Sequence, residues 1–202
     1  MGLFEWILGE EPNPISQMMI YENKGQFGEY LTEFAANKID GYYNILQNLY
    51  LPTYNGKTTE IDLVLIHTIG IFVFESKNYG GWIFGSENQK YWTQCFPNKE
   101  KYRFYNPIMQ NNTHINALVK ETNISKEKFY SFIIFSKRCE LKKVPENTSQ
   151  FEIMKRDELI YRLKRINKEQ REDVFTCKQV DEITKRLKIF TKVSDEIKQK
   201  HM

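Results

Sequence analysis

Hydrophobic residues follow two patterns along this chain, a helical spacing and nearly continuous runs, which predict helices and strands respectively. Over residues 26–38 they stand at Phe27, Leu31, Phe34 and Ala35, and this spacing is typical of a helix that buries one face. The same spacing predicts three further helices, over residues 106–122, 156–166 and from 176 onward. Each helix needs a sheet or another helix against which to bury its apolar stripe.

Two of these helices begin with residues that cap free backbone N–H groups. Asn106 precedes Pro107; an Asn side chain accepts hydrogen bonds from the first turn, and Pro suits the first helical position. Thr176 and Gln179 have the spacing of a capping box. These residues predict where the two helices start.

Nearly continuous runs of Ile, Leu, Val and Phe predict strands that are covered on both faces. Two such runs, 60–67 and 70–75, follow the turn residues 54–57. Further strands are predicted over residues 43–51, 129–135 and 151–154, and a hairpin over 82–85 and 90–93 with its turn at 86–89. The order of helices and strands is that of an α/β sandwich with a central mixed sheet.

Length and composition fit one ordinary globular domain. The chain has 202 residues, of which 41% are hydrophobic. We divide it into an N-terminal segment (1–24), a core (25–155) and a C-terminal helical extension packed on that core (156–202). The apolar stretch near the start is too short to span a bilayer, so we expect a capping segment and no membrane partner.

Charge and cysteine content narrow the function classes only slightly. The net charge of +3 neither demands nor excludes a nucleic-acid partner. Cys95, Cys139 and Cys177 lie far apart, without the paired spacing of a zinc site or a disulfide framework. We therefore expect a reducing, cytoplasmic setting.

The runs 60–67 and 70–75 bring three charged residues together if they form a hairpin. With a four-residue turn at 67–70, Asp62 lies opposite Glu75, and Lys77 lies on the same face as Glu75. Two opposed carboxylates destabilise each other in an apolar sheet. Mg²⁺ or Mn²⁺ offsets this repulsion and leaves room for substrate phosphate oxygens. The pattern therefore predicts phosphodiester hydrolysis by metal-activated water.

The register of this hairpin decides the interpretation. In the predicted register, the charged face continues into Val64, Ile66, Ile71 and Val73. A slip by one residue places Asp62 and Glu75 on opposite faces. A second interpretation leaves the charges at strand ends, facing solvent, with Lys77 as their ion-pair partner. Spacing alone leaves these alternatives open.

Four short motifs follow one another along the chain. They are Gly28-Glu29, Glu60-Ile61-Asp62, Gly70-Ile71-Phe72-Val73-Phe74-Glu75-Ser76-Lys77-Asn78, and Asn106-Pro107 with Gln110. In this order they resemble the NERD (nuclease-related domain) family of the PD-(D/E)xK superfamily, over roughly residues 25–120. The resemblance implies a restriction-endonuclease-like α/β/α sandwich, with residues 25–155 as the nuclease core.

The resemblance also implies which residues act. The implied catalytic residues are Glu29, Asp62, Glu75, Lys77 and Gln110. Asp62 and Glu75 would bind the metal together with Ser76 through its carbonyl, and Lys77 would position or activate the attacking water. Glu29 and Gln110 lie off the apolar stripes of their helices, so periodicity alone would place them on solvated faces.

Two positions depart from the superfamily pattern. Glu60-Ile61 stands where the superfamily has Pro before Asp, and Ser76 fills a position that is usually apolar. Neither departure removes a catalytic group.

Aromatic and basic residues are mixed over residues 78–103. Such a mixture suits stacking on unpaired bases and contact with phosphates, and we expect substrate contacts from Asn78, Tyr79, Lys90 and Arg103. The alternative is that the aromatic residues are core and the lysines are ordinary surface. The basic run 137–143 is expected to be a solvated loop. His67 and His114 lack metal-ligand spacing, so no role is predicted for either.

The leading functional hypothesis is an Mg²⁺- or Mn²⁺-dependent nuclease that acts on DNA in DNA processing. One alternative is a noncatalytic module that keeps the nuclease fold and binds nucleic acid or protein. The other is a ribonuclease with the same metal chemistry. These hypotheses share a fold and differ in substrate and in whether the site turns over.

Overall fold

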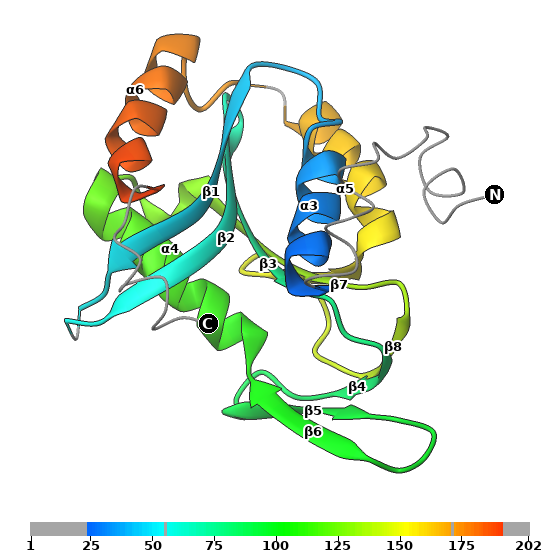
Figure 1. The fold of residues 1–202 in the computed structure, drawn as a ribbon. Helices are drawn as coiled ribbons and strands as arrows, with labels where there is room; N and C mark the ends of the chain where they lie inside the picture. Colours follow the sequence, from blue (N-terminus) through cyan, green and yellow to red (C-terminus); the bar gives the residue numbers. More distant parts are fainter. Residues whose placement is uncertain (1–23, 55, 171, 192–202) are drawn as a thin grey trace.

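A five-stranded sheet lies at the centre of the computed structural model, which describes residues 24–54, 56–170 and 172–191 (Figure 1). Nearly all of the predicted N-terminal segment, 1–24, lies outside the described residues. The strands stand in the order β1-β2-β3-β7-β9. Their bounds are β1 Tyr43–Pro52, β2 Thr58–His67, β3 Gly70–Lys77, β7 Phe129–Phe135 and β9 Glu152–Lys155.

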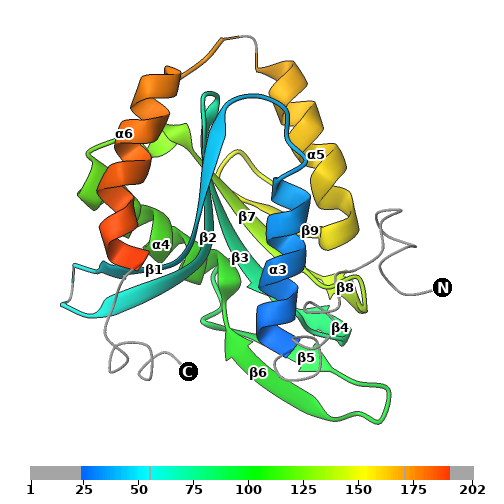
Figure 2. The same cartoon turned by 45° about the horizontal axis from the view of Figure 1, so that its top comes forward.

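The sheet is mixed, and helices cover both of its faces. Strands β1, β2 and β3 are antiparallel, whereas β7 and β9 run parallel to β3. One face is covered by α3 (Lys24–Ala36) and α5 (Arg156–Glu169), and the other by α4 (Pro107–Thr122) and α6 (Cys177–Lys188) (Figures 1 and 2). This arrangement confirms the predicted α/β/α sandwich with a central mixed sheet.

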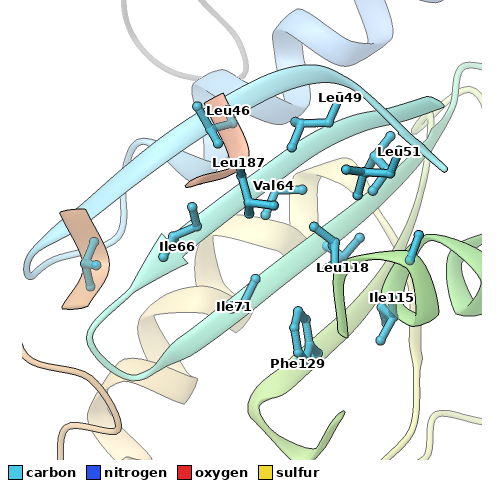
Figure 3. Close-up of a cluster of buried hydrophobic side chains, with 14 of the residues drawn as sticks. Leu46, Leu49, Leu51, Val64, Ile66, Ile71, Ile115, Leu118, Phe129 and Leu187 are labelled. Carbon is cyan, nitrogen blue, oxygen red and sulfur yellow. The ribbon is translucent and has the colours of Figure 1, made fainter. Parts of the chain in front are cut away.

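The α4/α6 face of the sheet contains the apolar set that the predicted register places together. Val64, Ile66 and Ile71, labelled in Figure 3, are fully buried in one cluster. Val73 belongs to the same cluster and is also fully buried. Ile115 and Leu118 of α4 and Val180 and Leu187 of α6 pack onto the same cluster. The predicted face is therefore confirmed.

Alternate residues of the same strands are buried on the α3/α5 face. Leu65, Phe72 and Phe74 pack there with Ala35 of α3 and Leu159 of α5. Burial on both faces explains why β2 and β3 are almost continuously apolar, because neither face can carry polar side chains without a partner.

A second, four-stranded sheet in the order β6-β5-β4-β8 projects from one end of the sandwich (Figures 1 and 2). Its bounds are β4 Gly81–Phe84, β5 Tyr91–Cys95, β6 Lys101–Tyr105 and β8 Cys139–Lys143. Strands β4 and β5 pair antiparallel, which confirms the predicted hairpin. The sequence pattern does not predict β6.

The expected solvated loop over 137–143 is wrong, because most of it forms β8. This strand pairs in parallel with β4. Cys139 is buried and Leu141 packs on the third apolar cluster, while Glu140 and Lys142 between and after them are exposed. Buried and exposed residues alternate over 139–142, a short pattern that is masked in the sequence by the basic residues. It forms a strand because the edge of β4 is available for pairing.

Both predicted helix caps are present. The Asn106 side chain accepts the Ile108 N–H at 2.9 Å, and Thr176 and Gln179 form a capping box. Short 3₁₀ turns at Lys126–Lys128 and Ile189–Thr191 complete the described structure. Among the described helices, none combines the length and apolar character needed to cross a bilayer.

Candidate active site

The ladder between β2 and β3 ends just before the predicted site. Its register follows the predicted turn, with His67 opposite Gly70, and the last pair is Leu63 with Phe74. At the next position the Asp62 carboxylate accepts the Ser76 backbone N–H at 3.1 Å. The Ser76 N–H is thus bound by a side chain and not by the backbone of β2. Asp62 and Glu75 therefore do not form the regular cross-strand pair that spacing predicts.

The pairing of β1 with β2 is interrupted at the same level. Gln47 pairs with Leu63 and Leu49 pairs with Ile61, so Asn48 stands opposite Asp62 without a ladder pair. Asn48 has a φ of 51°, a conformation that is uncommon for a residue other than glycine. Asp62 therefore lies at an irregularity that involves both neighbouring strands.

Glu75 is a buried carboxylate with two partners. Its side chain is 2% exposed, its Oε1 lies 2.6 Å from the Lys77 Nζ, and its Oε2 lies 2.9 Å from the His114 Nε2. Burial raises the pKa of Glu75, but the charges and hydrogen bonds of Lys77 and His114 outweigh burial, and the net shift is downward. Glu75 is therefore ionised at neutral pH.

Lys77 is held between Glu75 and Gln110. Its ammonium donates to the Gln110 Oε1 at 3.2 Å as well as to Glu75. Burial lowers the pKa of Lys77, but the charge of Glu75 raises it more, so the pKa lies above its ordinary value. Lys77 is therefore a fixed cation at neutral pH, suited to orient a water or a phosphate oxygen and not to remove a proton.

Asp62 lacks a comparable partner charge. Burial, Glu75 and Glu29 raise its pKa well above the usual range, and the Ser76 N–H and Lys77 oppose this shift only in part. The pKa of Glu29 is also raised, first by burial and then by the charges of Glu60 and Glu75. The site therefore holds more negative charge than Lys77 neutralises.

Glu60 adds to this negative charge from β2. The Tyr50 hydroxyl of β1 donates to the Glu60 Oε1 at 2.6 Å. Burial of the phenol, followed by this contact, raises the pKa of Tyr50. Within the motif Glu60-Ile61-Asp62, Glu60 thus accepts from a neutral donor. Asp62 instead lies close to the carboxyl groups of Glu75 and Glu29.

The donor set fits a partly hydrated divalent cation. In the part of the chain that the structure describes, no three His, Cys, Asp or Glu side chains form a metal cage by themselves. Mg²⁺ needs only one or two carboxylates when waters and substrate phosphates supply the other ligands. Asp62 and Glu75 would provide two, and each carboxylate oxygen can accept a second partner. A cation there would also relieve the repulsion at Asp62.

His114 belongs to this constellation, although the sequence pattern does not reveal it. It is 1% exposed, and its Nδ1 lies 2.9 Å from the Thr59 Oγ1. An ionised carboxylate only accepts, so the His114 Nε2 donates to Glu75. The sequence does contain one indication of this position: His114 follows Gln110 by four residues and so lies on the same face of the helix.

Ser76 also contacts the opposite side of the sheet. Its hydroxyl lies 3.1 Å from the Thr32 Oγ1 of α3 and accepts from the Arg156 Nη2 of α5 at 3.4 Å. The Ser76 hydroxyl thus links β3 to both α3 and α5 through polar contacts. Burial and the nearby Arg138 lower the pKa of Arg156 to about 10.

Gly28 explains how Glu29 comes close to β3. A Cβ at Gly28 would lie 2.8 Å from the Asn78 Cβ and 3.1 Å from the Arg156 Nη2. A larger residue would push α3 away from the end of β3. The adjacent Glu29 therefore lies close enough to Glu75 for their charges to interact, although α3 covers the other face of the sheet.

The four residues expected to contact substrate occupy different surroundings. Asn78 is half-buried and accepts from the Arg138 Nη2 through its backbone oxygen at 3.0 Å and its side chain at 3.2 Å. Tyr79 is half-buried and packs edge-on against Phe104, with ring centroids 4.7 Å apart. Arg103 is exposed on β6, and Lys90 is exposed directly before β5.

Comparison with known proteins identifies the same segment. The model of the nuclease-related domain matches residues 24–136, which include every predicted site residue. An uncharacterized protein of Bacillus anthracis is 36% identical over 158 residues, covering 75% of this chain and 73% of its own length. No solved structure matches the chain.

Proposed function

This chain belongs to the nuclease-related domain family. We propose that it is a metal-dependent nuclease that hydrolyses DNA phosphodiester bonds, with Asp62, Glu75 and Lys77 in its active site. One observation carries the proposal. Glu75, a buried carboxylate, lies 2.6 Å from the Lys77 ammonium, and a second carboxylate, Asp62, accepts the backbone N–H of Ser76 between them at 3.1 Å. A divalent cation and a phosphate would complete the charge balance.

The residues of the site have distinct roles in this proposal. Asp62, Glu75 and the Ser76 carbonyl would hold Mg²⁺ or Mn²⁺, which supplies Lewis acidity and lowers the pKa of a bound water. Lys77 donates an N–H to the attacking water and stabilises the negative charge that develops on the phosphate. Gln110 fixes the Lys77 ammonium by accepting from it at 3.2 Å.

Glu29 and His114 act around this centre. Glu29, with its raised pKa, would accept hydrogen bonds from waters of the cation. His114 donates to Glu75 and so fixes the orientation of a proposed metal ligand, as outer partners of metal ligands commonly do. Asn78, Tyr79, Lys90 and Arg103 are proposed to contact the nucleic acid.

The test is cleavage of linear, supercoiled and single-stranded DNA in the presence of Mg²⁺, Mn²⁺ or EDTA. We expect cutting with either metal and none in EDTA. Asp62→Ala and Lys77→Ala should each lower the rate by about 10²–10³-fold. Glu158→Ala and Lys164→Ala are matched controls, because both residues are exposed on α5, and they should cut like the wild type.

Two outcomes would contradict this proposal. If the wild type leaves every form of DNA intact with either metal, the chain is a binding module with a nuclease fold. If it cuts only a matched RNA strand, the same site belongs to a ribonuclease. Binding that survives Asp62→Ala together with absent cleavage would favour the first of these.

A further inference from the structure

The second sheet has one face buried in the molecule. Ile83 of β4 and Trp92 of β5 are fully buried in a cluster with Ile133 and Phe135 of β7. The Trp92 ring stacks on Phe135 with centroids 6.3 Å apart. Since successive strand residues point to opposite faces, the neighbours of Ile83 and Trp92 point away from the molecule.

The face that points away is rich in aromatic and basic side chains. We call it the outer face; beside Thr93, Cys95 and Glu140 it carries Trp82, Phe84, Tyr91, Lys101, Arg103 and Tyr105. Tyr91 pairs directly with Tyr105 across β5 and β6, and these side chains are 45% and 40% exposed. Phe84 is 37% exposed. A solvent-exposed aromatic surface of this kind marks a binding site more often than a surface of scattered residues does.

Cations lie beside the exposed rings. The Arg103 guanidinium carbon lies 5.7 Å from the centroid of the Tyr91 ring, and the Lys90 Nζ lies 5.5 Å from the same centroid. On β8, the Lys142 Nζ lies 5.9 Å from the centroid of the Trp82 ring and also forms an ion pair with the Glu140 carboxylate. The segments that form β4, β5 and β6 contain no Asp or Glu. With Lys101, Arg103 and Lys142 against the one carboxylate of Glu140, the outer face suits a polyanion and disfavours a basic or purely apolar partner.

We propose that the outer face binds single-stranded DNA, with unpaired bases stacked on Tyr91 and Tyr105 and phosphates held by Lys101 and Arg103. Exposed aromatic rings on a sheet can meet the flat faces of bases only where those bases are free of a duplex. This inference rests on the proposed function and names its substrate class, a single strand or a duplex with an unpaired end.

Chain connections join the outer face to the candidate active site. Strand β4 begins at Gly81, four residues after Lys77, and β6 leads through Asn106 into α4, which carries Gln110 and His114. Hydrogen bonds brace both junctions: the Gln94 Nε2 donates to the Gly80 carbonyl at 2.8 Å, and the Asn106 N–H donates to the Lys90 carbonyl at 3.0 Å. The sheet that carries the outer face is thus joined directly to the two elements, β3 and α4, that carry site residues.

The test measures binding without cleavage. A fluorescently labelled oligothymidylate of about twenty nucleotides is titrated with the full chain in EDTA, beside a blunt duplex of the same length. The variants are Tyr91→Ala with Tyr105→Ala, the same pair changed to Phe, and Arg103→Ala. Tyr161→Ala is the matched control, because Tyr161 is 71% exposed on α5, outside the second sheet. Thermal unfolding establishes that each variant is folded.

We expect the single strand to bind more tightly than the duplex. The Ala pair should weaken binding about 100-fold, about tenfold for each lost ring, whereas the Phe pair and Tyr161→Ala should bind like the wild type. Arg103→Ala should also reduce the salt dependence, by a slope of about 0.7 for one lost phosphate contact. The proposal is overturned if the Ala pair binds the oligothymidylate as tightly as Tyr161→Ala, or if the duplex binds as tightly as the single strand.

Failure of this proposal is distinguishable from failure of the proposed function. Binding in EDTA does not require hydrolysis, so a protein that never cuts DNA can still show the expected loss in the Ala pair. Conversely, metal-dependent cutting that the Ala pair retains at wild-type rate on single strands would leave the nuclease intact and remove the outer face as its substrate-binding surface.

Discussion

The His114 Nε2 lies 2.9 Å from the Glu75 Oε2, and both side chains are almost completely buried. The other ring nitrogen of His114 meets the Thr59 hydroxyl at 2.9 Å. This chain of contacts joins β2, α4 and β3 at the level of the candidate site. It holds Glu75 in one orientation while Lys77 occupies the other carboxylate oxygen.

His114→Ala should lower cleavage about 10- to 100-fold at saturating Mg²⁺, because Glu75 loses the donor that orients it. Thr59→Val keeps the shape of the side chain and removes only the hydroxyl, so its effect should be smaller and of the same kind. Steady-state cleavage and thermal unfolding of both variants provide the measurement. Full activity in a folded His114→Ala variant would show that Glu75 is oriented without the imidazole.

Asp62→Asn should stabilise the metal-free protein at neutral and alkaline pH. The pKa of Asp62 is raised in the folded state, so the carboxyl stabilises the fold while it is protonated. That contribution is complete below its ordinary value of 3.8 and is lost as the pH rises through the folded-state pKa. Asn carries no charge, so the variant avoids this loss.

The difference in melting temperature between Asp62→Asn and the wild type in EDTA should therefore grow from pH 4 toward pH 8. A difference of about 1 kcal/mol would appear as roughly 2–4 °C in a chain of this size. Mg²⁺ should raise the melting temperature of the wild type and leave that of the variant nearly unchanged. Equal responses to Mg²⁺ would place the metal elsewhere.

Asn106→Ala should destabilise the protein by about 2–4 kcal/mol. The fully buried side chain accepts from Ile108 N–H and donates to the carbonyls of Ser86, Glu87 and Gln89. Alanine removes the helix cap and the side-chain donor to the Glu87 and Gln89 carbonyls.

Asn106→Asp separates these two roles of the side chain. Asp retains the cap oxygen but turns a carboxylate toward the same carbonyls, so it should not rescue stability at neutral pH. Denaturant unfolding measures both variants. A fully stable Asp variant would mean that the cap alone matters.

Gly85→Ala should destabilise the second sheet by about 1–3 kcal/mol. A Cβ at this position would overlap the ring of Trp92, which is fully buried and whose Nε1 donates to the Ser86 carbonyl at 3.0 Å. Gly80→Ala is the control, because the atoms nearest to its Cβ would be 3.9 Å away. Chemical denaturation compares the two, and equal stability would show that Trp92 moves without cost.

Much of the architecture could be predicted because its causes are local. The alternation of Val64 and Ile66 with Leu63 and Leu65 sets which side chains share a face, and a one-residue slip would expose one whole set. Caps such as Asn106 act within a single turn. The order of Asp62, Glu75 and Lys77 on one hairpin therefore placed three site residues close together before any tertiary contact was considered.

Other features depend on contacts between distant segments and were beyond local periodicity. Glu75 and His114 are 39 positions apart, and Thr32 and Ser76 are 44 apart. The ladder break at Asp62 arises from β1 and β3 together, and β8 forms because β4 presents a free edge.

The sequence by itself determined the helices, most strands, the hairpin register and the presence of two carboxylates and a lysine near one another. Only the tertiary structure decided that His114 contacts Glu75, that Asp62 leaves the ladder and that aromatic and basic side chains share the outer face. The physical reason is that backbone periodicity fixes the direction of a side chain within its own element, whereas the identity of its partner depends on how separate elements pack.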